Sequence, residues 1–127
     1  MHRSSFVGKF ASVSFVLVLL LSTVLTGCSG GKEVKIGFVA QLTGSGAWVG
    51  QVAEIAIKDR VEEINAAGGI NGYKIKLISY DSRSEVADAV AATKRLIEQD
   101  KVSAIIGPEW SAAAIPIAAI ADESKVP

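Results

Sequence analysis

The sequence has few of the residues that enzymes use as nucleophiles, general bases or metal ligands. Its 127 residues include one cysteine, Cys28, and one histidine, His2. A single cysteine cannot close an intramolecular disulfide bond, and no histidine follows it that could activate a thiol or a hydroxyl. We therefore expect a protein that is not an enzyme, with no catalytic residue, no metal site and no cofactor.

The sequence also lacks net charge, because 13 lysines and arginines balance 13 aspartates and glutamates. Neither of its two tryptophans stands among clustered basic residues. No nucleic-acid partner is expected, since such binding needs a basic patch or stripe. Every acidic residue follows Cys28, whereas Arg3 and Lys9 precede it, so the later part of the chain is mildly acidic. The length allows at most one domain.

The first 27 residues begin with basic side chains, continue as a long uncharged apolar run and end in small residues. The apolar run covers residues 10–25, and Leu25-Thr26-Gly27 stands directly before Cys28. This pattern resembles the signal peptide of bacterial lipoproteins, in which the cysteine is lipidated and becomes the new N-terminus. The resemblance implies lipidation at Cys28.

The implied mature protein begins at Cys28. Residues 1–27 would be removed, residues 28–33 would form a flexible lipid-anchored tether, and the protein would be exported and held at the membrane by its lipid. The alternative is an uncleaved transmembrane helix, because about 20 apolar residues can span a bilayer. Polar residues at the far end of the run, Ser22, Thr23 and Thr26, favour cleavage instead.

A strand, a glycine-rich loop, a helix and a second strand are predicted between residues 34 and 81. VKIGFVA, at residues 34–40, is apolar and rich in β-branched residues, and QLTGSG after it does not continue a strand. From Val49 the apolar residues recur with helical period, as Ala53, Ile57, Val61 and Ile64. Glycines at 68 and 69 end this helix, and YKIKLISYD, residues 73–81, forms the second strand.

Two strands joined by one long helix should lie parallel, with a right-handed crossover. In such a sheet ligands bind at the carboxyl ends of the strands. The loop at residues 41–50 and the end of the second strand at Asp81 are therefore the first places to look for function. Asp81 itself is a single acid, and we expect it to be solvated or structural.

The rest of the chain is predicted to continue as α/β structure. Ser82 or Ser84 would cap a helix that runs to about residue 99, with Glu85 in its first turn. The helix face towards the sheet is expected to contain Val86, Val90, Thr93 and Ile97, with Ala89 and Leu96 beside them. Residues 102–107 would form a third strand covered on both faces, followed by a helix from Ser111 and by an approach to a fourth strand at Val126-Pro127.

The loop Gly44-Ser45-Gly46-Ala47-Trp48-Val49-Gly50 requires comparison with dinucleotide-binding fingerprints. Its spacing differs from theirs, and Asp81 lies much further along the chain than the roughly 20 residues that the fingerprint requires. A dinucleotide-dependent oxidoreductase is therefore a weak alternative. The loop also contains Trp48, whose large apolar side chain would either contact a ligand or pack in a core or between lobes.

A second loop of interest is Gly107-Pro108-Glu109-Trp110-Ser111-Ala112, which follows the third strand. Ser111 can serve as a simple helix cap. Alternatively, its hydroxyl and the free backbone N–H groups of a helix N-terminus can bind a carboxylate. Trp110 would supply an apolar wall beside that site, whereas Glu109 is a single acid, expected to be solvated or structural.

These residues resemble the substrate-binding proteins of branched-chain amino acid ABC transporters, which have the type I periplasmic binding fold of the leucine-binding type. The resemblance rests on IGFVAQLTGSGAWVGQ, VEEINAAGGINGYKIKLISYDSRS, AATKRLIEQDKVSAIIGPEWSAA and AAIADESKVP. It implies an α/β/α lobe with a parallel sheet, so residues 34–127 would be an incomplete N-terminal lobe. In that family two lobes close on an amino acid, and the closed form docks on a membrane permease.

The resemblance also implies roles for individual residues. Ser111 corresponds to the serine that binds the ligand α-carboxylate, and Trp110 and Ala112 flank it. Trp48 stands one place before the position where the family usually has an aromatic residue, which is Val49 here. The family's second lobe, which holds the acid for the ligand ammonium, has no counterpart in these residues. A small lipoprotein with an interaction role is the other alternative.

Overall fold

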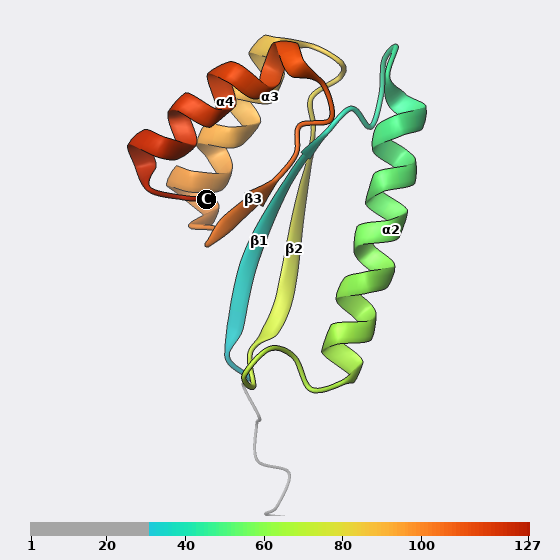
Figure 1. Ribbon diagram of the computed structural model, residues 1–127, viewed down its shortest axis with the longest axis vertical. Helices are drawn as coiled ribbons and strands as arrows, with labels where there is room; N and C mark the ends of the chain where they lie inside the picture. The colour runs from blue at the N-terminus through green and yellow to red at the C-terminus, as the bar shows by residue number, and fades with distance from the viewer. Residues whose placement is uncertain (1–30) are drawn as a thin grey trace, which may run out of the picture. The chain divides into compact units, whose positions relative to one another are not determined.

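The computed structural model describes residues 31–127. The predicted signal peptide at residues 1–27, the lipidation site Cys28 and the start of the tether lie outside the described residues. Three parallel strands form one sheet with helices on both faces (Figure 1). The elements are β1 Glu33–Ala40, α2 Ala47–Ala66, β2 Lys74–Asp81, α3 Val86–Arg95, the π-helical turn η1 Leu96–Asp100, β3 Ala104–Ile106 and α4 Ser111–Ser124.

The strand order is β2-β1-β3, so β1 is central. β1 pairs with β2 from Glu33↔Lys74 to Ala40↔Asp81 and with β3 around Gly37↔Ile105. The predicted parallel sheet and the α/β/α layering are thus confirmed. α2 lies alone on one face of the sheet, whereas α3 and α4 lie side by side on the other (Figure 1).

The connection from α2 to β2 explains the sequence INAAGGINGYKI. Asn65, near the end of α2, donates from Nδ2 to the carbonyl of Ile75 at 2.8 Å and accepts from the Ile75 N–H at 2.7 Å. Gly69 has φ of +85°, and a Cβ there would lie 2.0 Å from the carbonyl oxygen of Tyr73. The side-chain amide therefore pairs with β2 while glycine lets the chain turn tightly.

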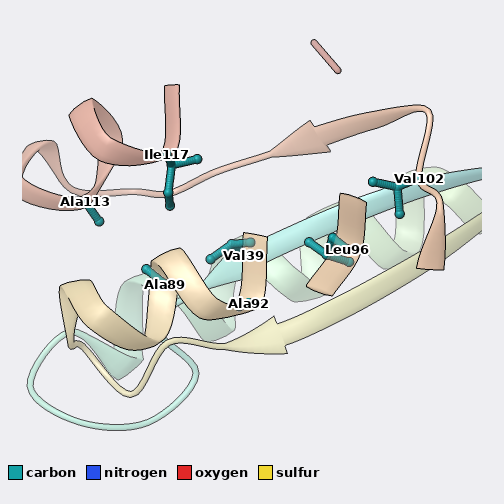
Figure 2. Close-up of a cluster of buried hydrophobic side chains, with 7 residues drawn as sticks. All are labelled: Val39, Ala89, Ala92, Leu96, Val102, Ala113 and Ile117. Atoms are coloured by element: carbon teal, nitrogen blue, oxygen red, sulfur yellow. The ribbon is translucent and has the colours of Figure 1, made fainter. Parts of the chain in front are cut away.

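The hydrophobic core lies between the sheet and the pair α3 and α4. Val39 of β1 is fully buried there, and Leu96, at the start of η1, is buried beside it. Figure 2 shows these side chains together with the other members of the cluster, which are Ala89, Ala92, Val102, Ala113 and Ile117. Small residues on α3 and α4 allow the two helices to approach closely.

The predicted start of α3 is wrong in two respects. Neither Ser82 nor Ser84 caps the helix, and Glu85 occupies the N-cap position instead of the first turn. Ser82 Oγ donates to the carbonyl of Ala40 at 2.9 Å, and Ser84 Oγ accepts from the N–H of Gly46 at 3.0 Å. Both serines are thus used to bind the loop after β1.

The predicted buried face of α3 and η1 is confirmed for Ala89, Thr93 and Leu96 and is wrong for Val86. Ala89, Ala92 and Thr93 are the buried residues of this helix, whereas Val86 is exposed. Small side chains face inwards here because α4 packs directly against α3. Val86 therefore lies at the margin of the contact, whereas Leu96 is fully buried as predicted.

β3 is shorter and less covered than predicted, since Ile106 is 42% exposed. On its outer edge the N–H of Ile105 donates to the carbonyl of Pro127 at 2.7 Å. Val126 packs against the core cluster. The chain at residues 126–127 therefore runs beside β3, as the predicted approach to a fourth strand requires. Between residues 31 and 127 no helix combines the length and the apolar character needed to cross a bilayer.

Candidate functional site

The carboxyl ends of β1 and β3 bring two loops to the same edge of the sheet (Figure 1). The first loop joins β1 to α2, and the second loop joins β3 to α4. The predicted ligand-binding residues lie in these loops or in the first turns of the helices that follow them. Gly107 has φ of +101°, and a Cβ there would lie 2.2 Å from the carbonyl oxygen of Val39. The second loop is therefore packed directly on the end of β1.

Asp81 fixes the first loop. Its Oδ1 accepts hydrogen bonds from the backbone N–H groups of Leu42 at 2.9 Å, Thr43 at 3.1 Å and Arg83 at 2.8 Å. Its Oδ2 accepts from the hydroxyl of Thr43 at 2.6 Å. Desolvation alone would raise the pKa of Asp81, but hydrogen bonds from Thr43, Arg83 and Leu42 outweigh it and lower the pKa below its usual value. Asp81 is structural, as expected.

The glycines of the first loop serve close packing. A Cβ at Gly46 would lie 1.9 Å from the side chain of Gln41, and one at Gly50 would lie 2.3 Å from the Gln41 carbonyl oxygen. Gly44 has φ of +87° and lies against the backbone of Arg83. Each glycine is accounted for by packing or by its backbone conformation, so the loop needs no bound nucleotide to explain its composition.

Trp48 does not lie in the loop, because α2 begins two residues earlier than the apolar pattern indicated. The helix starts at Ala47, so Trp48 lies in its first turn. Its side chain is 73% exposed, which rules out packing in the core of the described residues. Its indole is therefore accessible to a ligand or to another surface.

The second loop leads into α4, whose first residue is Ser111. Trp110 occupies the N-cap position with extended backbone and makes no side-chain cap hydrogen bond. The prediction of Ser111 as the N-cap is therefore wrong, because the serine stands one residue too late to close the first turn. The hydroxyl of Ser111 is not needed for capping.

The amides at the start of α4 can serve an anion. In any α-helix the first N–H groups have no acceptor within the helix. In α4 the helical hydrogen bonds begin with the N–H of Ala114, which donates to the carbonyl of Trp110. Ser111 and Ala112 precede it and are both exposed. Their N–H groups, the Ser111 hydroxyl and the positive end of the helix dipole together form a geometry that suits a carboxylate.

Trp110 and Glu109 stand beside this helix start. Trp110 is half-buried and packs against the core cluster, which fixes one side of its ring. Both carboxylate oxygens of Glu109 are buried, and within residues 31–127 neither has a hydrogen-bond partner. The expectation of a solvated Glu109 is therefore wrong. Nothing in the sequence distinguished this glutamate except its place directly before Trp110.

A surface hollow of the described residues lies elsewhere. A groove of about 690 Å³ runs between α4 and the outer edge of β3, lined mainly by Ile105, Ala114, Ile117, Ala121 and Val126. None of the predicted ligand-binding residues lines it. Within residues 31–127 no cluster of histidine, cysteine or acidic side chains has a geometry that could hold a metal ion.

Comparison with known proteins places this arrangement in a family. A family model described as "Periplasmic binding protein" matches residues 33–127. An amino acid binding protein of Pseudomonas aeruginosa is 40% identical over 94 residues, which cover 74% of this chain and 25% of that protein. The Leu/Ile/Val-binding protein BraC3 of Rhizobium johnstonii is 33% identical over the same length and the same shares. The chain thus spans about a quarter of these relatives.

A solved structure shows the same fold. The branched-chain amino acid transporter substrate binding protein LivJ from Streptococcus pneumoniae, in complex with isoleucine, aligns with a TM-score of 0.74 and 42% sequence identity. The alignment covers 76% of this chain and 28% of that protein.

Proposed function

Since residues 33–127 belong to the periplasmic binding protein family, we propose that the chain is part of the solute-binding component of an ABC transporter. Its solute would be a branched-chain amino acid or a related molecule, captured outside the cytoplasmic membrane and passed to a permease. The relatives, which include a Leu/Ile/Val-binding protein and an isoleucine-bound protein, support this choice of solute. The proposed role is binding, not catalysis.

The observation that carries the proposal is the uncapped start of α4 at the carboxyl edge of the sheet. The Ser111 hydroxyl and N–H and the Ala112 N–H would bind the solute carboxylate. Charge-assisted hydrogen bonds of this kind are roughly twice as strong as neutral ones. Trp110 would form an apolar wall, because its ring is held against the core.

Trp48 is the remaining proposed contact. It lies in the first turn of α2 at the same edge of the sheet, where an exposed indole could reach a ligand held between two lobes. Its helical neighbours on the same face, Val52 and Ile55, are also exposed.

The domain boundaries and the location belong to the same proposal. Residues 1–27 would be a cleaved signal peptide, residues 28–33 a tether lipidated at Cys28, and residues 34–127 an incomplete N-terminal lobe. The family is described as periplasmic, which supports export. The lipid anchor rests on the sequence pattern before Cys28 alone.

A chimera tests the proposed function. Residues 33–127 would replace the matching part of LivJ from Streptococcus pneumoniae, which is similar enough in fold for the exchange. Calorimetric titration should show isoleucine binding by the chimera, with the unmodified LivJ as control. A chimera that unfolds cooperatively but does not bind any branched-chain amino acid would contradict the proposal, because its ligand wall would then be unsuited to such solutes.

A further inference from the structure

The start of α2 has none of the side chains that usually cap a helix. Its N-cap residue is Gly46, which has no side chain, and its third helical residue is Val49, which cannot accept a hydrogen bond. In a capping box, a glutamate or glutamine at that third position accepts from the backbone N–H of the N-cap residue. The N–H of Gly46 therefore needs an acceptor from elsewhere in the chain.

Ser84, in the turn after β2, supplies this acceptor. Its Oγ accepts from the N–H of Gly46 at 3.0 Å and donates to the carbonyl of Thr43, also at 3.0 Å. A hydroxyl has one hydrogen to donate, so its donor is fully used by the loop. One side chain thus binds the loop between β1 and α2 at two points, from a position 38 residues beyond Gly46.

The backbone of the turn takes an unfavourable conformation to place this hydroxyl. Arg83 and Ser84 have φ of +51° and +62°, in a left-handed region that L-residues other than asparagine and aspartate rarely occupy. Asp81 accepts from the N–H of Arg83 at 2.8 Å, and the Arg83 side chain pairs with Asp88 at 2.7 Å. These contacts hold the turn in its shape. Backbone strain of this kind is concentrated at functional sites.

The turn and the loop are in close contact. A Cβ at Gly44 would lie 2.6 Å from the carbonyl oxygen of Arg83 and 2.7 Å from Oγ of Ser84. Glycine at position 44 therefore allows the loop to approach the turn closely enough for the hydrogen bonds of Ser84. The sequence of the loop and the conformation of the turn thus serve the same contact.

Trp48 depends on this contact for its position. It is the second residue of α2 and follows Gly46 by two residues. Its side chain is 73% exposed, so packing in the core of residues 31–127 does not hold the indole. The place of the indole is instead set by the backbone at the start of α2, which Ser84 anchors.

We propose that Ser84 is a positioning residue of the solute site. It holds the loop between β1 and α2 so that Trp48 lies against the solute, and it does not contact the solute itself. This inference rests on the proposed function, in which Trp48 contacts the solute. Removing the hydroxyl then has two effects that can be measured separately. The loop loses protection, which needs no solute to observe, and the solute is bound less tightly.

Hydrogen–deuterium exchange of the 127-residue chain measures the first effect. The matched control is Asn65→Ala, which removes two hydrogen bonds to Ile75 at the opposite end of α2. We expect residues 43–48 to exchange about tenfold faster or more in Ser84→Ala than in Asn65→Ala, because local opening of the loop adds to any global loss of stability. Equal exchange in these two variants would overturn the proposal.

Ser84→Gly separates the hydroxyl from the backbone strain. Glycine adopts the left-handed conformation readily but has no hydroxyl, so residues 43–48 should exchange as fast in Ser84→Gly as in Ser84→Ala. Protection of the loop in Ser84→Gly equal to that of the wild type would overturn the proposal, because the turn would then hold the loop without the hydroxyl.

Isoleucine binding by the chimera with LivJ measures the second effect. Ser84→Ala should weaken binding about fivefold or more, and Asn65→Ala by less than about twofold, because only the first variant releases the loop. When Trp48→Ala is already present, adding Ser84→Ala should change the affinity by less than about twofold, since the side chain that Ser84 positions is gone. A merely structural role of Ser84 would not depend on Trp48.

The outcomes distinguish this inference from the proposed function. An unchanged affinity in Ser84→Ala, or an equal loss with and without Trp48, would overturn the role of Ser84 in solute binding. A chimera that unfolds cooperatively but binds no branched-chain amino acid would contradict the proposed function instead. The exchange experiment alone would then decide whether Ser84 positions the loop.

Discussion

Asp81 holds Thr43 at two points, accepting from its backbone N–H at 3.1 Å and from its hydroxyl at 2.6 Å. The end of β2 therefore fixes the loop that leaves β1, although the two residues are 38 positions apart. The bonds are charge-assisted, and they help to determine where α2 begins. Asp81 thus holds the loop between β1 and α2 in place, although we do not propose that Asp81 contacts the ligand.

Asp81→Asn should destabilise the fold by about 1–2 kcal/mol, because a neutral amide accepts these hydrogen bonds less strongly and part of the site is open to solvent. The pKa of Asp81 is lowered in the folded state. Its stabilisation is therefore fully present above its unfolded pKa and is lost as the pH falls through the lower folded pKa. Urea unfolding between pH 7 and pH 2 should show a smaller acid-induced loss in Asp81→Asn than in the wild type.

The control for this experiment is Glu98→Gln, an exposed acid in η1. It should leave the acid dependence of unfolding close to that of the wild type. If Asp81→Asn and Glu98→Gln behave alike, the hydrogen bonds to Asp81 do not contribute to stability as the geometry indicates.

Gly50→Ala should destabilise the protein even though Gly50 lies inside α2. Helix propensity alone predicts a gain of about 1 kcal/mol, since alanine is the better helix former. The structure predicts the opposite, because the new Cβ would lie 2.3 Å from the Gln41 carbonyl oxygen and the backbone would have to move. Thermal unfolding decides between the two predictions. A raised melting temperature would show that the backbone at Gln41 can move away from the new Cβ without a loss of stability.

The strand–helix–strand unit could be predicted because its signals are local. The apolar period of α2, the glycines after it and the β-branched strands all indicate the same unit, and the structure confirms it. The start of α3 could not be predicted. Ser82 and Ser84 bind backbone atoms 42 and 38 residues away, so a pattern that normally marks a helix cap was used for a tertiary contact.

The candidate site was predictable only in part. A serine and a tryptophan after a strand indicated the start of α4, and the structure places both at the carboxyl edge of the sheet. The N-cap of α4 is Trp110 and not Ser111, one residue earlier than predicted. This position depends on the extended backbone of Trp110, which cannot be predicted from residue types alone. The burial of Glu109 likewise depends on how its loop packs, which a single sequence does not encode as a pattern.

Cys28→Ser should abolish lipidation and release the protein from membranes, or stall its processing. The reason is chemical, because the thiol is the only site in the predicted pattern that can form a thioether. Mass spectrometry of the N-terminal peptide and membrane fractionation measure the result, with Ser29→Ala as the neighbouring control. A soluble wild type that retains residues 1–27 would contradict the proposed location.

Glu109→Gln should stabilise residues 31–127 by about 1–3 kcal/mol in the absence of any ligand. The carboxyl oxygens of Glu109 are buried without a hydrogen-bond partner within residues 31–127, and a carboxyl group without partners costs more to bury than an amide. Urea unfolding at pH 7 measures the change, and Glu123→Gln on the exposed end of α4 is the control. Destabilisation by Glu109→Gln would show that the carboxylate has a donor.

Ser111→Ala in the chimera with LivJ should weaken isoleucine binding by about 1–3 kcal/mol, which is roughly 5-fold to 150-fold in Kd. The loss follows because the hydroxyl does not cap α4 and is free to donate to the solute carboxylate. Ser124→Ala is the matched control, since Ser124 is an exposed serine at the opposite end of the same helix, where the dipole repels anions. Calorimetry should find its affinity unchanged. Equal affinities for the two variants would mean that the backbone N–H groups of Ser111 and Ala112 suffice for the carboxylate.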